Sequence, residues 1–212
     1  MTIETRKEYF RLSEEQIRVW PADQEAELLC ERPTIVSTCF ADADRYRQPL
    51  IDRVLELEKD PAFTHHMQTG SSKVENVHQW NLPEAGFIQE RALSFYIQVA
   101  KRPGSKVDLC WATVYRNGDY LTPHSHDRAT GTLVYCLDAG DPDYEKNLFS
   151  GKLVFADPRI DYCCNAEENC VTRPLQATMR EGTMVLFPGP IVHFVHPYIG
   201  SRPRITLTWN VN

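Results

Sequence analysis

Two histidines separated by one residue, His124 and His126, lie in the stretch NGDYLTPHSHDRATGTLVYCL, just ahead of a run of β-forming residues. On an extended chain, residues two apart point to the same side and lie about 6.5 Å apart, so both imidazoles can approach one ion if the backbone bends. His193 follows on another predicted strand and supplies a third nitrogen. Three such ligands on one side of an ion leave its other coordination positions open.

Two further polar residues follow His193 in the stretch RPRITLTWN. Arg204 comes eleven residues after His193, and Thr206 shares its face of the predicted strand. Burial of an arginine in a β core costs free energy unless the guanidinium meets an anion. Because no obvious carboxylate lies beside Arg204 in the sequence, the expected anion belongs to a ligand.

These segments resemble a known family. YRNGDYLTPHSHD, GKLVFADPR and EGTMVLFPGPIVHFVHPYIGSRPRITLTWN are similar to the iron(II)/2-oxoglutarate-dependent oxygenases, especially the 2OG-Fe(II) oxygenase family of bacteria and phages, and more distantly the prolyl hydroxylases. The resemblance covers roughly residues 106–212. It implies a double-stranded β-helix (jelly roll, cupin-like), Fe(II) and 2-oxoglutarate.

By position, the resemblance makes His124 the first metal ligand and His193 the distal one. It implies that Arg204 and Thr206 bind the C5 carboxylate of 2-oxoglutarate, and that Tyr115 lines the wall of the cosubstrate site. The implied reaction consumes dioxygen, converts 2-oxoglutarate to succinate and CO2, and oxidises a C–H bond of a small molecule or peptide, usually by hydroxylation.

The chain departs from the family pattern at His126, where the family has an aspartate or glutamate. Our prediction is that His126 is the third ligand, because this keeps the ligand count intact. A neutral imidazole at this position removes one negative charge from the metal site. Alternatives are coordination by Asp127, or a two-histidine site open to a halide, as in the superfamily's halogenases. Cupin dioxygenases that use three histidines and no 2-oxoglutarate are another, but they have no need of Arg204. A jelly roll that binds metal or ligand without turnover is an alternative of a different class.

Residues expected at the substrate pocket have weaker signals. A histidine three residues after His193 would pack at the strand end or orient substrate, and tryptophans at alternating strand positions are core residues by default. The turn ADPR would place polar residues at the rim. The predicted pocket residues are Asp157, Arg159, His196, Trp209 and Asn210.

The elements that must position these residues follow from hydrophobic periodicity. Apolar residues at three- to four-residue spacing predict helices within 41–60 and 82–101, the second with Pro83 in its first turn. Residues 65–81 are polar enough for a loop, and we expect them to form a lid. Apolar, β-branched and aromatic runs predict six strands, within 106–115, 130–137, 151–158, 182–189, 191–198 and 204–211. The expectation is a single mainly β domain (α+β), with a helical buttress and lid at 1–105 and a jelly-roll core at 106–212.

Composition limits the classes of partner. The 212 residues carry a net charge of -6 and no Lys/Arg cluster, which argues against nucleic acid or an anionic membrane as the main partner. No apolar stretch approaches a membrane span or a signal core, so we expect a cytoplasmic protein. Seven cysteines without framework spacing predict reduced thiols, and Cys163, Cys164 and Cys170 are expected to form an ordinary loop. The oligomeric state is left open.

Overall fold

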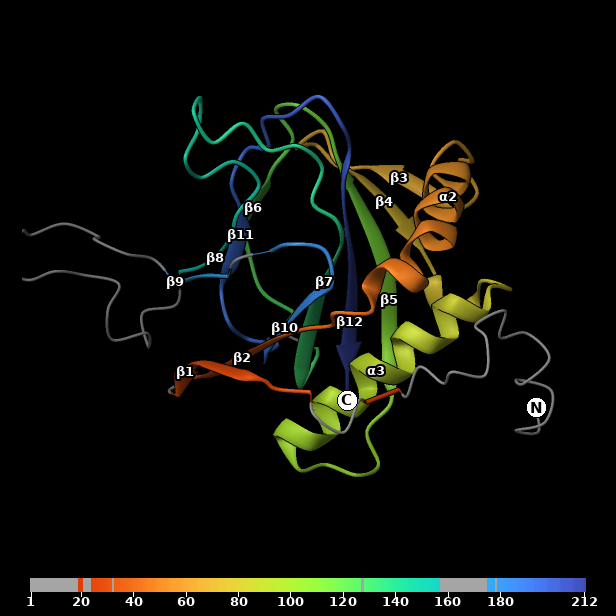
Figure 1. Cartoon of the computed structure of the whole chain (residues 1–212), viewed down its shortest axis with the longest axis vertical. Helices are drawn as coiled ribbons and strands as arrows, with labels where there is room; N and C mark the ends of the chain where they lie inside the picture. Colours follow the sequence, from red (N-terminus) through yellow and green to blue (C-terminus); the bar gives the residue numbers. More distant parts are fainter. Residues whose placement is uncertain (1–18, 21–23, 32, 127, 157–174, 178) are drawn as a thin grey trace, which may run out of the picture.

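Two antiparallel sheets face each other, and two helices cover the outer side of the larger one (Figure 1). The structure is a computed structural model that describes residues 19–20, 24–31, 33–126, 128–156, 175–177 and 179–212. The large sheet has the order β1-β2-β10-β7-β12-β5-β4-β3, and the small sheet has the order β6-β11-β8-β9. This is the expected fold class: mainly β with flanking helices, with the sheet pair of the double-stranded β-helix.

The strand bounds show where the sequence prediction holds. The six predicted strands are all present, as β5 (Val107–Tyr115), β7 (Gly131–Asp138), β8 (Leu153–Phe155), β10 (Thr183–Pro188), β11 (His193–Val195) and β12 (Arg204–Val211). Six more were not in that set: β1 (Glu27–Glu31), β2 (Thr34–Cys39), β3 (Thr64–His66), β4 (Ser72–Glu75), β6 (Leu121–His124) and β9 (Leu175–Ala177).

The two helices lie where the periodicity predicts them. Helix α2 spans Arg47–Leu57 and helix α3 spans Pro83–Ala100, with short 3-10 turns at Ala43–Arg45 (η1) and Val77–Gln79 (η2). Proline occupies the first turn of α3, where a missing N–H costs nothing, and Lys101 ends the helix at φ 56. The apolar faces of both helices pack on the large sheet to form the main core.

The prediction of a loop at residues 65–81 is wrong. Strands β3 and β4 form a hairpin there and extend the large sheet at its β5 edge. Their three and four residues are too few to display a period of two, and five of these seven side chains are polar or charged and at least partly exposed. A boundary at residue 105 therefore does not separate helices from sheet, because β1 to β4 all precede it.

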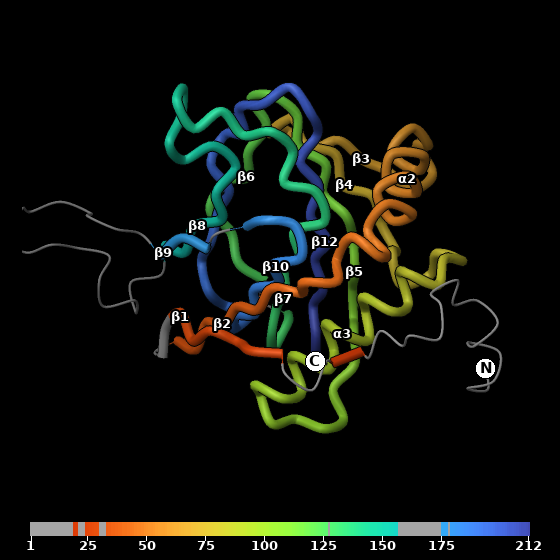
Figure 2. Tube along the Cα trace, viewed as in Figure 1, coloured from red at the N-terminus to blue at the C-terminus, as the bar shows by residue number. Residues whose placement is uncertain are grey.

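A second, smaller core fills the space between the sheets. It includes Val185 and Phe187 of β10, Phe155 of β8 and Val195 of β11. The chain trace shows β6, β8 and β11 on one side of the central strands and both helices on the other (Figure 2). Each central strand therefore divides its side chains between the helix side and the inter-sheet side.

The thiols and the helices bear on two expectations from composition. Cys39, Cys110 and Cys136 are free thiols, as expected, while Cys163, Cys164 and Cys170 lie outside the described residues. Burial raises the pKa of Cys136 to about 12, so this thiol stays protonated near neutral pH. Within the described part of the chain, no helix is both long and apolar enough to cross a membrane.

Candidate metal centre and cosubstrate pocket

Strand pairing in the small sheet brings His124 and His193 together. His124 ends β6, His193 begins β11, and the two are direct partners in the antiparallel register. Side chains of such partners lie side by side on one face. Their ring centroids are 4.3 Å apart. A separation of 69 positions in sequence thus becomes a contact between neighbouring strands.

His126 joins this pair from the segment just after β6. Its backbone N–H donates to the carbonyl of Gly189 at 2.8 Å, which draws the segment toward the start of β11. The Nε2 atoms of His126 and His193 are 3.3 Å apart, and ligand atoms of all three histidines lie within 4.8 Å of one another. No other group of three or more metal-ligating side chains occurs among the described residues.

The ring nitrogens are arranged as a metal requires. His124 Nδ1 lies 2.7 Å from the carbonyl oxygen of Thr122, and His193 Nδ1 lies 2.9 Å from that of Ile191. A carbonyl can only accept, so each Nδ1 carries a proton, and in the neutral form of such a ring the Nε2 lone pair is available to a metal. Burial, followed by the nearby His124, lowers the pKa of His193 to about 3, so this imidazole is neutral.

The separation of Nε2 atoms also suits an ion. Two nitrogens bound about 2.1 Å from one ion lie about 3.0 Å apart at an octahedral angle and about 3.4 Å apart at a tetrahedral one. The 3.3 Å between His126 and His193 falls within that interval. The ring of His126 stacks on Trp111, with centroids 5.6 Å apart and planes 15° from parallel. The donor set therefore fits Fe(II), and the Trp111 ring orients the imidazole of His126, which stands where the family has a carboxylate.

Arg204 lies across the cavity from the histidines, on the large sheet. It begins β12 opposite Tyr115 of β5, and its guanidinium carbon lies 4.9 Å from the centre of the Tyr115 ring. Arg204 is 3% exposed, yet neither of its terminal nitrogens has a hydrogen-bond partner among the described residues. A buried guanidinium with two free terminal nitrogens is a site for a carboxylate.

Neighbours of Arg204 complete this polar wall. Thr206 lies on the same face of β12 and pairs with Thr113 of β5, and both side chains are buried. Burial raises the pKa of the Tyr115 hydroxyl, partly offset by the positive charge of Arg204, so the phenol stays protonated. Ile205 and Leu207 point into the helix-side core, as the alternation predicts.

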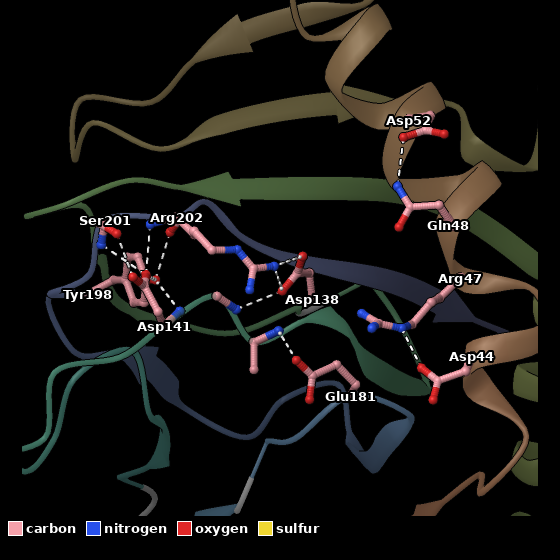
Figure 3. A network of polar contacts seen from close by, with 12 residues as sticks. Asp44, Arg47, Gln48, Asp52, Asp138, Asp141, Glu181, Tyr198, Ser201 and Arg202 are labelled. Carbon is pink, nitrogen blue, oxygen red and sulfur yellow. Dashed lines mark hydrogen bonds and ion pairs between the residues drawn. The ribbon is translucent and has the colours of Figure 1, made fainter.

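A clamp of hydrogen bonds holds the loop that precedes β12 (Figure 3). Asp141 accepts hydrogen bonds from the hydroxyls of Tyr198 and Ser201 and from the backbone N–H groups of Ser201 and Arg202. These bonds, that of the Ser201 hydroxyl foremost, lower the pKa of Asp141 to about 2. Arg202 also pairs with Asp138. The clamp ties the chain after β7 to the chain before Arg204.

A cavity of about 450 Å3 between the sheets contains both groups of residues. Most of the residues predicted from sequence line it, and these are Tyr115, His124, His126, His193, Arg204, Thr206 and Asn210. Asp127, Asp157 and Arg159 lie outside the described residues.

Two predicted pocket residues are placed elsewhere. Trp209 lies on the opposite face of β12 and is fully buried in the helix-side core. Side chains alternate along a strand, and Trp209 is an odd number of positions away from the cavity-facing Arg204 and Thr206. His196 lies beyond the end of β11 and packs against Phe149 and Phe194, with both centroid distances 5.0 Å. Neither lines the cavity, so the prediction is wrong for both.

Several cavity residues were missed by the sequence analysis. Trp111 was taken as a core residue, yet it is only half-buried and lines the cavity together with Leu109, Met67 and Lys73. Alternation along β5 places Trp111 on the face of Tyr115, so that signal was available. Lys73 and Met67 lie in the β3–β4 hairpin, which the sequence analysis did not predict, and no sequence signal pointed to them.

Comparisons with known proteins agree with this geometry. Residues 109–210 match the family model described as "Putative 2OG-Fe(II) oxygenase". No curated protein matches the sequence.

Several solved structures share the fold. One is the non-haem α-ketoglutarate-dependent epimerase SnoN of nogalamycin biosynthesis, with 12% identity, a TM-score of 0.63 and coverage of 86% of this chain and 78% of that one. The viral collagen prolyl hydroxylase of Paramecium bursaria Chlorella virus-1, solved as its 2OG complex, has 13% identity, a TM-score of 0.57 and coverage of 86% and 97%. A prolyl-4-hydroxylase of Pseudomonas putida has 15% identity, a TM-score of 0.59 and coverage of 83% and 91%.

Proposed function

Because this chain belongs to the 2OG-Fe(II) oxygenase family, whose enzymes use Fe(II) and 2-oxoglutarate, we propose that it couples conversion of 2-oxoglutarate to oxidation of a substrate C–H bond, usually hydroxylation. The family oxidises small molecules or peptides with dioxygen. The residues proposed to carry the chemistry are His124, His126 and His193 for the metal, and Arg204, Thr206 and Tyr115 for the cosubstrate.

The observation that carries this proposal is the unpartnered guanidinium of Arg204. Its two terminal nitrogens are buried and make no hydrogen bond with any described residue. Such a group costs free energy unless a ligand anion occupies the site. The guanidinium and the Thr206 hydroxyl would hold the far carboxylate of 2-oxoglutarate, and the keto acid end would then be left for the histidine side of the same cavity.

When bound, Fe(II) and 2-oxoglutarate supply the oxidising chemistry, in which one oxygen atom of dioxygen goes to succinate, with loss of CO2, and the other to the substrate. The protein's part is placement. Thr122 and Ile191 carbonyls hold the His124 and His193 rings in the ligating tautomer. The apolar side chains of Val134 and Leu153 line the same cavity and limit access of water to the site.

A substitution at Arg204 tests the cosubstrate assignment. Loss of one partner of a buried charge pair costs about 2 to 5 kcal/mol, so Arg204→Ala should lose about 30-fold or more in 2-oxoglutarate affinity. It should keep its iron, because no metal ligand changes. Arg204→Lys should recover part of the affinity, because it keeps the charge and loses the bidentate geometry. Arg202→Ala is the matched control, since the Arg202 side chain is exposed, pairs with Asp138 and does not line the cavity.

The measurements are anaerobic calorimetry of 2-oxoglutarate binding to the Fe(II) protein and succinate formation in air. The all-histidine donor set favours one other candidate, a three-histidine dioxygenase that uses no 2-oxoglutarate. Undiminished 2-oxoglutarate affinity in Arg204→Ala would make that candidate the better explanation.

A further inference from the structure

The charged side chains that line the cavity, within the described part of the chain, are all cations. They are Lys73, Arg128 and Arg204, in a protein whose net charge is -6. Replacement of the family's carboxylate ligand by His126 removes the negative charge that would otherwise accompany a divalent ion. If 2-oxoglutarate occupies Arg204, then Lys73 and Arg128 still present positive charge to the rest of the cavity.

The two remaining cations are placed to meet a ligand. Lys73 lies on β4, and its ammonium nitrogen is 4.6 Å from the centre of the Trp111 ring, the ring on which His126 stacks. The carboxylate of Glu75 is 3.5 Å from the Lys73 ammonium, beyond a strong charge-assisted hydrogen bond, and is itself 45% exposed. Arg128 is exposed between β6 and β7 and forms no ion pair with any described residue.

An apolar surface lies beside these charges. Leu109 and Met67 line the cavity although they are 49% and 37% exposed, and Trp111, which also lines it, is half-buried. Large apolar side chains that stay exposed around a cavity mark a place where a ligand covers them. The hydroxyl of Thr69, which also lines the cavity, is buried and has no hydrogen-bond partner among the described residues.

From this juxtaposition we propose that the substrate is an amphiphilic anion. Its flat or apolar part packs on Trp111, Leu109 and Met67, and its carboxylate, phosphate or sulfate pairs with Lys73 and Arg128. This inference rests on the proposed function, because it assigns Arg204 to 2-oxoglutarate and leaves the outer cations for the substrate.

Binding of a matched pair of probes tests the charge requirement. 2-Naphthoate and the neutral 2-naphthamide have the same ring system and nearly the same shape. Each is titrated by calorimetry, without oxygen, into protein saturated with Fe(II) and 2-oxoglutarate. We expect 2-naphthoate to bind at least about 5-fold more tightly than 2-naphthamide at low salt, and we expect this preference to fall as the salt concentration rises. 2-Naphthyl phosphate and 2-naphthalenesulfonate then show which anionic group is preferred.

Variants separate this effect from a general loss of structure. Lys73→Met and Arg128→Gln should each weaken 2-naphthoate about 3-fold or more and leave 2-naphthamide unchanged. Glu75→Gln should strengthen 2-naphthoate, because it removes the counter-charge of Lys73; a damaged fold would not produce this gain. Lys59→Gln, which removes a charge just after α2 and outside the cavity lining, should change neither probe.

Equal affinities for the two probes, or an equal loss of 2-naphthoate binding in Lys59→Gln, would overturn the inference. The 2-oxoglutarate titration is read separately. If 2-oxoglutarate binds and the probes show no charge preference, the substrate inference alone fails. If 2-oxoglutarate does not bind while Lys73→Met and Arg128→Gln still weaken 2-naphthoate selectively, the proposed function fails and the anion site stands.

Discussion

Replacement of His126 by phenylalanine tests the least usual feature of this site, a third imidazole at the family's carboxylate position. Phenylalanine can keep a flat ring against Trp111, on which His126 stacks at 5.6 Å, but it provides no nitrogen. His126→Phe therefore removes a proposed ligand while it preserves most of the packing. His126→Ala removes both.

The expected loss of iron affinity follows from the ligand geometry. His126 Nε2 is 3.3 Å from His193 Nε2, a separation suited to two donors on one ion. Loss of a group that merely orients a ligand costs 10- to 100-fold in metal affinity, so loss of a ligand should cost at least about 100-fold, or about 2.8 kcal/mol. His126→Asp restores a carboxylate and should bind iron.

The assay is anaerobic competition for Fe(II) against a chromogenic chelator, with thermal unfolding of the metal-free proteins as a control for the fold. Asp127→Asn is the comparison that decides whether His126 or the adjacent Asp127 is the third metal ligand. Unchanged iron affinity in both His126→Phe and His126→Ala would refute the three-histidine assignment. A large loss in Asp127→Asn alone would transfer the third position to that carboxylate.

Three further predictions concern the framework. Arg91→Met should lower the free energy of unfolding by about 3 kcal/mol in urea titrations, because it breaks a bidentate pair with Asp42 in which the arginine is fully buried. An unchanged free energy of unfolding would mean that this ion pair contributes nothing to stability. The folded-state pKa of Asp141 is depressed to about 2, so its stabilisation is present above the usual carboxyl range and is lost as pH falls. Asp141→Asn should therefore lower the melting temperature at pH 7, with the difference from the parent shrinking from about pH 5 toward pH 2, and a pH-independent difference would contradict this. Gly189→Ala should weaken both stability and Fe(II) affinity, because a Cβ there would lie 2.0 Å from the carbonyl oxygen of Ala129 and 2.6 Å from that of His126. Normal iron affinity in a folded variant would show that the backbone at Gly189 does not position His126.

The sequence by itself determined the helices and the central strands. Apolar residues recur every three to four positions in α2 and α3, and β5, β7 and β12 are runs of eight or nine mostly apolar, β-branched or aromatic residues. Burial of these side chains dominates the favourable free energy of folding. The sequence also indicated His124, His126, His193 and Arg204, because these polar residues interrupt or border runs that a β core would otherwise fill with apolar side chains.

Only the tertiary structure decided how these residues meet and what surrounds them. The register of β6 on β11 places His124 beside His193, and that register depends on hydrogen bonds between segments far apart in sequence. The same holds for the terminal nitrogens of Arg204, which find no hydrogen-bond partner among the described residues, because this outcome depends on every neighbour of β12. The β3–β4 hairpin, which brings Lys73 and Met67 to the cavity, is too short for its sequence to show a period. It is held by pairing with β5, an interaction that no local pattern encodes.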